Sequence, residues 1–565
     1  MNAPHRAIGD SPRDGPSRRW LLALLMITAF AAWLRFPALD VRPMQGDEAV
    51  HAIKLDELLR TGRYVYDPHE YHGPTLYYFT LPICWATGVR SIADIDERTL
   101  RIVPAIFGVG LILLLPLVAD GLGRGATMWA AALIATSHAF VFYGRYYIQE
   151  TLLVFFTFAA IACWWRFLRS ERLGWAIAAG ASVGLAHATK ETIIIAAGCA
   201  VAACVLNSQV LRGWQREVPI PAGAPNADTL STESDEILST LLGMRRHAAI
   251  RIGAGVVFQA AGVVSICMFS AFFTHWRGVL DSVLTYATYL GRADGDGIHN
   301  HPWWFYLQRI AYTHFAAGPV WSEAVILVAA LLGFVVAATP RTSPQRNDGD
   351  PRFVQFVAAY TLLLTLAYCL IPYKTPWCAL GFLHGMTLLG GVGIAWLAGS
   401  QVASVRFIAV AACFALAIGQ LASQAATGST RFASDNRNPY VYAHPIRSVV
   451  ELGTFVERVA AAQADGRRTL VHVYMHDAWP LPWYLRRLER VGYWEQPQTN
   501  IDAPIVIADE SLAPRLDSQL GEQYAAYRYG IRPDTRVIVY VRRDAKQRFD
   551  RSQSHDPQPH AEAQP

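Results

Sequence analysis

Charged residues are scarce in this chain. Only 16% of its 565 residues are Asp, Glu, Lys or Arg, and 53% are hydrophobic. A soluble globular chain carries about 25% charged residues, so this one lacks the polar surface that a water-soluble protein of its length needs. The net charge of +5 is spread over short loops and forms no basic stripe, so nucleic acid is set aside as a partner.

Cysteine pairs and nucleotide-binding motifs are also missing. The sequence has eight cysteines and none stands in CxxC spacing, which argues against a disulfide framework and a zinc ribbon. We expect these cysteines to be small apolar packing residues. Neither a P-loop nor a dinucleotide fingerprint is present, so a cytosolic nucleotide donor is not indicated.

Long apolar runs fill the first three quarters of the chain, whose mean hydropathy is +0.22. Runs of about 18 or more residues can cross the ~30 Å of hydrocarbon in a bilayer. The sequence therefore predicts a polytopic α-helical membrane domain over residues 20–428, with about eleven crossings. The predicted spans are 20–39, 101–120, 127–144, 150–166, 174–189, 191–207, 251–273, 319–338, 353–371, 377–398 and 405–424.

Arginines fix the predicted orientation, because positive charge stays in the cytoplasm. Residues 1–19 are polar and basic and are predicted to be a disordered cytoplasmic N-terminus. Segment 74–88 is too short to span, so we interpret it as a re-entrant or interfacial helix on the outer face, beside the amphipathic stretch 51–60. The remaining connections then alternate correctly, with these residues inside: Arg124, Arg166, Arg169, Arg172, Arg212, Arg216, Arg245, Arg246, Arg341, Arg346, Arg352 and Arg406.

This threading predicts a multi-pass protein of the cell (cytoplasmic or inner) membrane with outer loops at 40–100 and 274–318. Residues 429–545 are predicted to form a small extracytoplasmic α/β domain, with strands at 469–474, 504–508 and 536–541 and helices at 449–462 and 519–527. The inner loop 218–240 and the tail 546–565 are predicted to be disordered. The aromatic, Pro-rich patch 479–484 suits either a glycan surface or a packing seam.

Polar groups at the ends of the apolar segments all fall on the predicted outer face. Charges near hydrocarbon are costly to hold, so their convergence predicts a functional site. The candidate catalytic acids are Asp47, Glu48 and Glu150, and the candidate substrate-binding residues are His72, Arg145, Gln149, Lys190, Glu191, Tyr373 and Lys374.

These residue types suit transfer from a phosphate-activated lipid. A carboxylate such as Asp47 can act as general base on a hydroxyl or bind a metal. Arg145 can grip a phosphate bidentately, and Lys190 and Lys374 can stabilise a departing phosphate. Each has a structural alternative: an acidic pair at a helix N-terminus, an Arg–Glu pair at a span end, or lysines that fix the depth of a hairpin.

A metal site is a weaker expectation. His299 and His301 flank one residue in the outer loop, with Asp294 and Asp296 nearby, and such groups can hold a cation. The spacing is loose, so a divalent metal is possible but no cofactor is required by the sequence.

Five short segments resemble the GT-C glycosyltransferases, and specifically their protein O-mannosyltransferase and aminoarabinose-transferase branch. They are Asp47-Glu48, residues 72–76, Arg145 with Gln149-Glu150, and the Pro/Trp segments 371–377 and 479–485. The last two look like a prokaryotic subgroup that is associated with flippase activity in archaeal glycosylation.

The resemblance implies inverting transfer of a hexose or mannose-like sugar from a polyprenyl-phosphate donor to a glycan, lipid or protein acceptor. It implies Asp47 as base, with Arg145, Lys190 and Lys374 as phosphate contacts and Glu48 and Glu150 as orienting acids. His72-Gly73 replaces the family's lysine, and Glu150 its usual aspartate, which leaves the phosphate contacts and a metal role open.

Two other functions are compatible with such a chain. A translocator of lipid-linked sugar, or its accessory subunit, needs polar groups through the bilayer interior and on both faces, whereas the charges here cluster on one face. A non-catalytic scaffold would tolerate loss of both Asp47 and Arg145.

Overall fold

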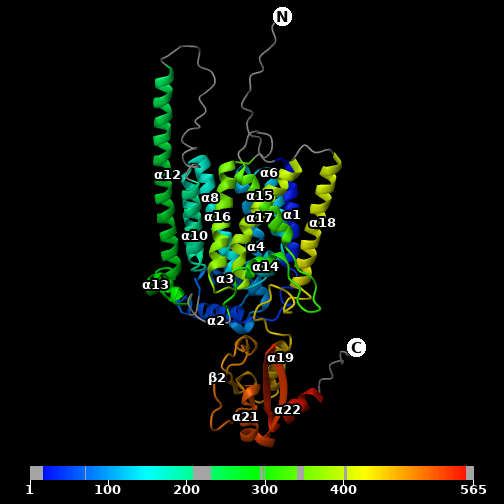
Figure 1. Ribbon diagram of the computed structural model, residues 1–565. Helices are drawn as coiled ribbons and strands as arrows, with labels where there is room; N and C mark the ends of the chain where they lie inside the picture. Colours follow the sequence, from blue (N-terminus) through cyan, green and yellow to red (C-terminus); the bar gives the residue numbers. More distant parts are fainter. Residues whose placement is uncertain are drawn as a thin grey trace.

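The computed structural model describes residues 17–69, 72–207, 231–292, 297, 299–339, 349–399 and 404–554. They form a bundle of roughly parallel helices with a small α/β domain at one end (Figure 1). This confirms the predicted fold class, a mostly helical membrane protein with a small C-terminal α/β domain.

Every predicted apolar span overlaps a helix of the bundle, although the predicted span 127–144 is divided at Ser137 into two helices. The helices are α1 (Arg18–Arg35), α4 (Glu97–Leu114), α6 (Arg124–Thr136), α8 (Glu150–Ser170), α9 (Leu173–His187), α10 (Ile193–Leu206), α12 (Ser231–Phe269), α15 (Ala324–Ala338), α16 (Pro351–Leu370), α17 (Leu380–Gly399) and α18 (Ser404–Ser429). Within the described residues, 5 helical stretches are long and apolar enough to cross a membrane: Glu97–Leu122, Glu150–Ser170, Met244–Phe269, Pro351–Leu370 and Pro376–Gly399. The helices α9, α10 and α15 are apolar but shorter, so the number of crossings stays a prediction.

Small residues let α17 pass through the centre of the bundle. A Cβ on Gly391 would lie 2.3 Å from the carbonyl oxygen of Ala126 in α6, and one on Gly393 2.3 Å from that of Ala329 in α15. Close backbone approach of this kind is how apolar helices associate where no hydrophobic effect drives them together.

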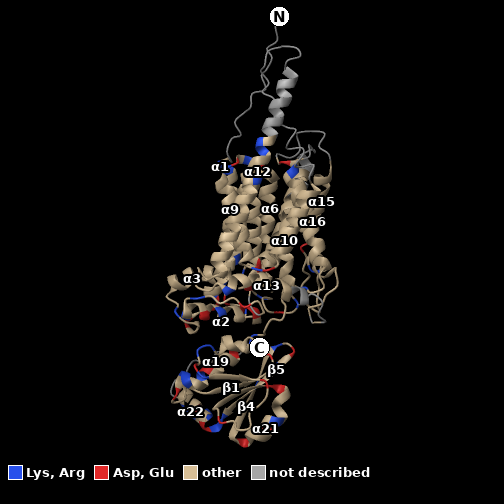
Figure 2. Cartoon of the chain, turned by 90° about the vertical axis from the view of Figure 1, so that its left-hand side faces the viewer, with Lys and Arg blue, Asp and Glu red and all other residues tan. Residues whose placement is uncertain are grey.

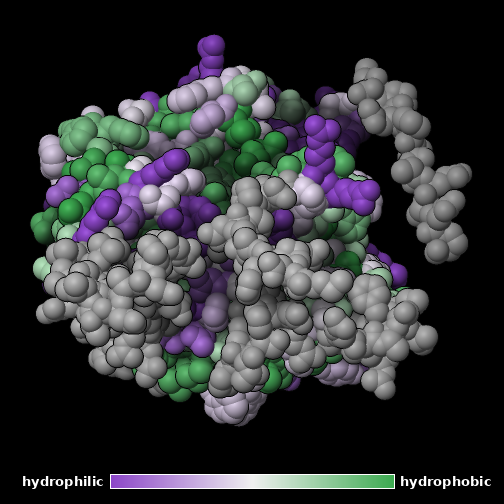
Figure 3. Space-filling view, turned by 90° about the horizontal axis from the view of Figure 1, so that it is seen from above, coloured by the Kyte–Doolittle hydropathy of each residue, from purple (hydrophilic) through white to green (hydrophobic). Residues whose placement is uncertain are grey.

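The connections at one end of the bundle form short helices of their own. These are α2 (Gly46–Thr61), α3 (Thr75–Thr87), α7 (His138–Tyr143), α13 (Arg277–Arg292) and α14 (Phe305–Ala311), whereas the short helix α5 (Ala119–Leu122) follows α4 at the other end. The helix α2 lies across the end of the bundle that faces the α/β domain (Figure 1). Charged residues gather at the bundle ends and are sparse between them (Figure 2). Hydrophilic side chains also cover parts of the opposite end (Figure 3).

The α/β domain contains one sheet with strand order β2-β1-β3-β5-β4. The strands are β1 (Val471–Tyr474), β2 (Val491–Trp494), β3 (Ile505–Asp509), β4 (Tyr524–Arg532) and β5 (Thr535–Arg542). β1 is parallel to β2 and β3, and β5 is antiparallel to β3 and β4. The helices α19 (Ser448–Ala461), α20 (Leu481–Tyr484), α21 (Ala513–Leu520) and α22 (Arg543–Ser554) complete the domain. The three predicted strands and the predicted helix 449–462 are therefore present.

The predicted helix 519–527 is wrong. The helix α21 ends at Leu520, and Tyr524 begins strand β4, which pairs with β5 across the turn at Pro533 and Asp534. The apolar spacing of residues 519–527 fits a helix locally. However, the two-residue turn and the strongly β-forming strand β5 that follows it give this segment a pairing partner, and the pairing outweighs the local helix preference.

Three predictions of disorder are also wrong in part. Arg18 and Arg19, predicted within the disordered N-terminus, begin α1, which Ser17 caps by accepting the Trp20 N–H. Residues 546–554 belong to α22, because Phe549 packs edge-on against Phe455 and Ala545 is buried. Residues 231–240 begin the long helix α12, which extends an apolar helix at little cost once it is nucleated. The predicted disorder at 1–16, 218–230 and 555–565 lies outside the described residues.

Candidate active site

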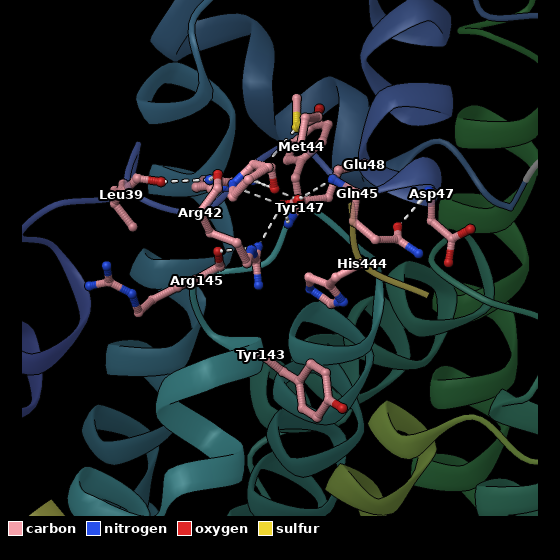
Figure 4. A network of polar contacts seen from close by, with 12 residues as sticks. Leu39, Arg42, Met44, Gln45, Asp47, Glu48, Tyr143, Arg145, Tyr147 and His444 are labelled. Atoms are coloured by element: carbon pink, nitrogen blue, oxygen red, sulfur yellow. Dashed lines mark hydrogen bonds and ion pairs between the residues drawn. The ribbon is translucent and has the colours of Figure 1, made fainter. Parts of the chain in front are cut away.

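The acidic pair Asp47-Glu48 occupies the first turn of α2. Gln45 caps this helix: its Oε1 accepts the Asp47 N–H at 2.5 Å, and its own N–H donates to Glu48 Oε2 at 3.2 Å. This reciprocal capping box satisfies two backbone donors and places both acids at the favourable end of the helix dipole. The two carboxylates point in different directions, Glu48 into a polar network and Asp47 away from it (Figure 4).

Glu48 is fully buried and fully engaged. Arg101 donates from Nε to Oε1 at 2.8 Å and from Nη2 to Oε2 at 2.6 Å, and Arg42 Nη2 and the Tyr147 N–H each donate to Oε1 at 2.9 Å. Burial alone would raise the pKa of Glu48, but Arg101 and Arg42 lower it to about 2. Glu48 therefore holds the chain before α2 against α4 and the α7–α8 connection. Neither arginine was predicted from the sequence as part of the site, although Arg101 stands at the boundary of the predicted span 101–120, where a charge is itself a signal.

Asp47 is half-buried and its carboxylate is unoccupied. Within the described part of the chain, no hydrogen bond or ion pair engages its side chain. Burial, and then the nearby charge of Glu150, raise the pKa of Asp47 to about 6. A free carboxylate that titrates near neutrality is suited to accept a proton from a bound hydroxyl.

Two ion pairs lie beside Asp47. Lys190, in the turn between α9 and α10, pairs with Glu150 at the start of α8, and both side chains are buried. His72 Nδ1 lies 2.8 Å from Glu191 Oε2, while the Tyr66 hydroxyl donates to Glu191 Oε1 at 2.8 Å. Burial raises the pKa of Glu191, but His72 and the hydrogen bonds to it lower the value to about 2. The segments that carry Asp47-Glu48, His72, Glu150 and Lys190-Glu191 therefore meet at this end of the bundle.

A glycine allows the second of these pairs to form. The Thr75 N–H donates to the Ala188 carbonyl at 3.1 Å, and the Thr75 and Thr189 hydroxyls are 2.7 Å apart. A Cβ on Gly73 would lie 2.2 Å from that carbonyl oxygen. Only glycine lets the His72 loop dock on the α9–α10 turn at this distance.

Arg145 does not face Asp47. Its guanidinium donates to the carbonyls of residues 34, 35, 37 and 38 at 2.6 to 3.3 Å, so it caps the end of α1. Gln149 lies closer to the α8 start, is buried, and leaves its Nε2 without a partner among the described residues.

The predicted substrate-binding residues Tyr373 and Lys374 contact the outer loop. Lys374 is buried, donates from Nζ to the carbonyls of His301 and Ile371, and so caps α16. Tyr373 is exposed, and its ring centroid lies 4.8 Å from that of His299. His299 Nδ1 is 2.7 Å from the Tyr442 hydroxyl.

The described residues around His299 and His301 do not form the predicted metal site. His301 stacks on Phe305 with ring centroids 4.1 Å apart, and the predicted partners Asp294 and Asp296 lie outside the described residues. In the part of the chain that the structure describes, no three His, Cys, Asp or Glu side chains converge as metal ligands.

An apolar groove begins at Glu150. It runs between α8, α10, α16 and α17 and is narrow and partly open to the surroundings. Its walls include Leu153, Phe158, Ile161, Ala196, Tyr360 and Leu364. A groove of this character accepts hydrocarbon and ends at the ion pair of Glu150 with Lys190.

The patch 479–484 forms a packing seam against the chain before Asp47. The Met44 N–H donates to the Tyr484 hydroxyl at 2.8 Å, and Trp483 Nε1 donates to Glu97 Oε1 at 2.9 Å. Gly46 lies beside Trp479, where an added Cβ would be 3.8 Å from the tryptophan Cβ. The α/β domain thus contacts the segment that positions the acidic pair.

Comparison with known proteins agrees with the sequence motifs. Residues 76–221 match the family model of dolichyl-phosphate-mannose-protein mannosyltransferase, which indicates a glycosyltransferase. The fold is similar to that of ArnT from Cupriavidus metallidurans bound to undecaprenyl phosphate, with a TM-score of 0.60 and 14% identity over 93% of this chain and 98% of that one. The apo state of the same ArnT gives a TM-score of 0.54 and 13% identity over 92% and 98%.

No curated protein sequence matches this chain. The similarity to ArnT shows that the chain has the GT-C fold. Together with the family match, it confirms the predicted resemblance to the protein O-mannosyltransferase and aminoarabinose-transferase branch. The likeness to the flippase-associated subgroup stays a prediction.

Proposed function

We propose that this membrane protein is an inverting glycosyltransferase that moves a sugar from a polyprenyl-phosphate donor to an acceptor hydroxyl on the extracytoplasmic face of the cell membrane. One observation carries the proposal. The unoccupied carboxylate of Asp47 lies beside the Lys190–Glu150 and His72–Glu191 pairs, and Glu150 also lines an apolar groove.

The reaction follows from these positions. Asp47 accepts the proton of the acceptor hydroxyl, whose oxygen attacks the anomeric carbon from the side opposite the phosphate. The new glycosidic bond forms as the sugar–phosphate bond breaks, and the configuration inverts. The polyprenyl phosphate leaves with the bond's electron pair, and Lys190 and His72 stabilise its charge.

The groove explains why the donor is a lipid. Its apolar walls start at Glu150, so a prenyl tail can lie along α8 and α17 while its phosphate reaches Lys190. The likeness to ArnT bound to undecaprenyl phosphate supports this donor class. The family match favours a hexose or mannose-like sugar, and the acceptor is a glycan, lipid or protein.

The other predicted residues divide into two groups. Glu48, Arg145 and Lys374 are occupied by internal contacts, and we assign them to holding the site together. Gln149 has a free buried amide N–H, and we assign it to substrate. Glu191 orients His72. Asp47 supplies the base and Lys190 the cation, so this arrangement does not require a divalent metal.

The test is transfer of radiolabelled sugar from a polyprenyl-phosphate donor by purified wild type and Asp47→Asn, with and without chelator. Loss of the base should lower the rate by about 10²- to 10⁴-fold while insertion and protein level stay unchanged. Asp94→Asn, an exposed acid of the same outer region, is the matched control and should transfer normally.

Three outcomes would change the proposal. Retained transfer by Asp47→Asn removes Asp47 as the base. Loss of transfer with chelator establishes a metal. If the wild type transfers sugar from no donor but moves lipid-linked sugar across vesicle membranes, the protein is a translocator.

A further inference from the structure

Around Glu48, buried arginines outnumber buried acids. Arg35, Arg42, Arg101 and Arg145 are each at most 7% exposed, and within the described residues Glu48 is the carboxylate that hydrogen-bonds to any of them. The next acids are Asp40, which pairs with Arg98 at 2.9 Å, and Glu97, which accepts from Trp483. Four buried guanidinium groups are therefore matched by one hydrogen-bonded carboxylate, that of Glu48. Buried charge of one sign is unfavourable unless something compensates it.

A small cavity opens among these arginines. It has room for about one water-sized sphere and is lined by Ala38, Leu39, Arg42, Arg101, Phe142, Arg145, Ser429 and Ala433. It lies between the end of α1, the α7–α8 connection and the end of α18. Arg42 and Ser429 both line it, and Arg42 Nε and Ser429 Oγ are buried without a hydrogen-bond partner in the described structure. Buried donors of this kind are rare unless a ligand or water satisfies them.

The arginines also disfavour one another's charge. Burial lowers the pKa of Arg42 to about 10, and burial followed by the charges of Arg42 and Arg101 lowers that of Arg145 to about 10. The Arg42 guanidinium lies over the Tyr146 ring, 4.3 Å from its centroid. This contact helps to hold the cation but brings no negative charge.

We propose that this cavity binds a small inorganic anion of halide size, chloride in the cell, between Arg42, Arg145 and Ser429. The number of free donors selects a halide over an oxyanion. Arg145 already serves four carbonyls and Arg101 serves Glu48 and the carbonyls of residues 39, 42 and 43. The orphaned N–H and O–H satisfy a spherical anion, whereas phosphate needs a partner for each of several oxygens. The bound anion would stabilise the cluster that holds Glu48 and the start of α2.

Thermal unfolding of the purified full-length protein tests the site without any use of sugar transfer. The buffer contains sodium gluconate, replaced stepwise by chloride, bromide or phosphate at constant ionic strength. Chloride and bromide should raise the Tm of the wild type saturably, by about 2–4 °C. In Ser429→Ala the midpoint of this rise should move to at least tenfold more chloride, and in Ala433→Leu, which fills the cavity, the rise should vanish.

Ser423→Ala, an exposed serine of the same helix, is the control and should respond as the wild type does. Bromide-soaked crystals should show an anomalous peak beside Arg42, which decides the case even if Ala433→Leu fails to fold. Equal salt dependence in wild type, Ser429→Ala and Ser423→Ala, with no bromide peak, would overturn the site. Saturation by phosphate at lower concentration than chloride would overturn the halide assignment.

Discussion

Adjacent carboxylates of α2 have opposite environments. The burial of Asp47 and the nearby charge of Glu150 raise the pKa of Asp47 to about 6. Glu48 instead bonds to two arginines, which hold its pKa at about 2. Environments that push the pKa values of neighbouring acids apart separate a proton acceptor from a permanent anion.

The raised pKa of Asp47 predicts the pH profile of transfer. The base acts only when deprotonated, so kcat/KM should fall about tenfold per pH unit below pH 6 and level off above it. Initial rates between pH 4.5 and 8 measure this, with Asp94→Asn as a control of unchanged profile. A profile with no inflection near pH 6 would contradict the role of Asp47.

Glu48→Gln should destabilise the protein by about 3–5 kcal/mol, because it leaves Arg101 and Arg42 buried without a counter-charge. Its folded pKa of about 2 lies below the unfolded value of ~4.3. The stabilisation is therefore fully present above that unfolded value and is lost as the pH falls toward 2.

Unfolding measured at pH 7 and at pH 3.5 should thus show a smaller difference between Glu48→Gln and wild type at the lower pH. Glu489→Gln is the matched control, because its exposed pair with Arg468 contributes at most about 1 kcal/mol. Equal stability of Glu48→Gln and wild type at pH 7 would argue against the structural role.

At the scale of elements, the site depends on how closely connections dock. The His72 loop reaches the α9–α10 turn because Gly73 has no side chain, and the α/β domain reaches the acidic pair through Tyr484. Both contacts join segments that are far apart in sequence, so each fixes a relative position that no single helix sets.

Gly73→Ala should separate this loop from the turn. The added Cβ would meet the backbone of Ala188 at 2.2 Å, so the loop must shift, at a cost of about 1–3 kcal/mol. The His72–Glu191 pair should break, and KM for the lipid donor should rise. Thermal unfolding and donor titration measure both effects.

Gly174→Ala in α9 is the control, since nothing lies within 4 Å of its added Cβ. It should be neutral or stabilise the helix by up to about 1 kcal/mol. If Gly73→Ala behaves in the same way, the docking of the His72 loop is not needed.

At the scale of the whole molecule, the start of the first helix and the candidate site lie at opposite ends of the bundle. The start of α1 lies at one end of the bundle, and α2 and the α/β domain lie at the other (Figure 1). The candidate site and the domain that contacts it therefore share one side of whatever membrane the bundle crosses.

Reporter fusions should reveal which side this is. Alkaline phosphatase fused after Ser554 should be active, because the domain is predicted to be extracytoplasmic, and the same enzyme fused before residue 17 should be inactive. A cytoplasmic fluorescent reporter at each position should give the reverse pattern. Active phosphatase at both positions would contradict an odd number of crossings.

The sequence by itself determined the helices of the bundle and the face on which the polar groups gather. Apolar length and arginine position are local properties, and they are enough to say that Asp47, His72, Glu150 and Lys190 all stand at the same end of the bundle. The three central strands were predictable for the same reason, since each is a short β-branched run between turns.

Only the tertiary structure decided which groups touch. That Glu48 belongs to Arg101 and Arg42, that Lys190 pairs with Glu150, and that Arg145 and Lys374 cap helices depends on packing between residues up to hundreds of positions apart. Strand β4 and helix α22 likewise formed against partners that their own sequences do not reveal. The energy of a helix in a membrane is mostly local, whereas the state of a buried charge is set by its neighbours.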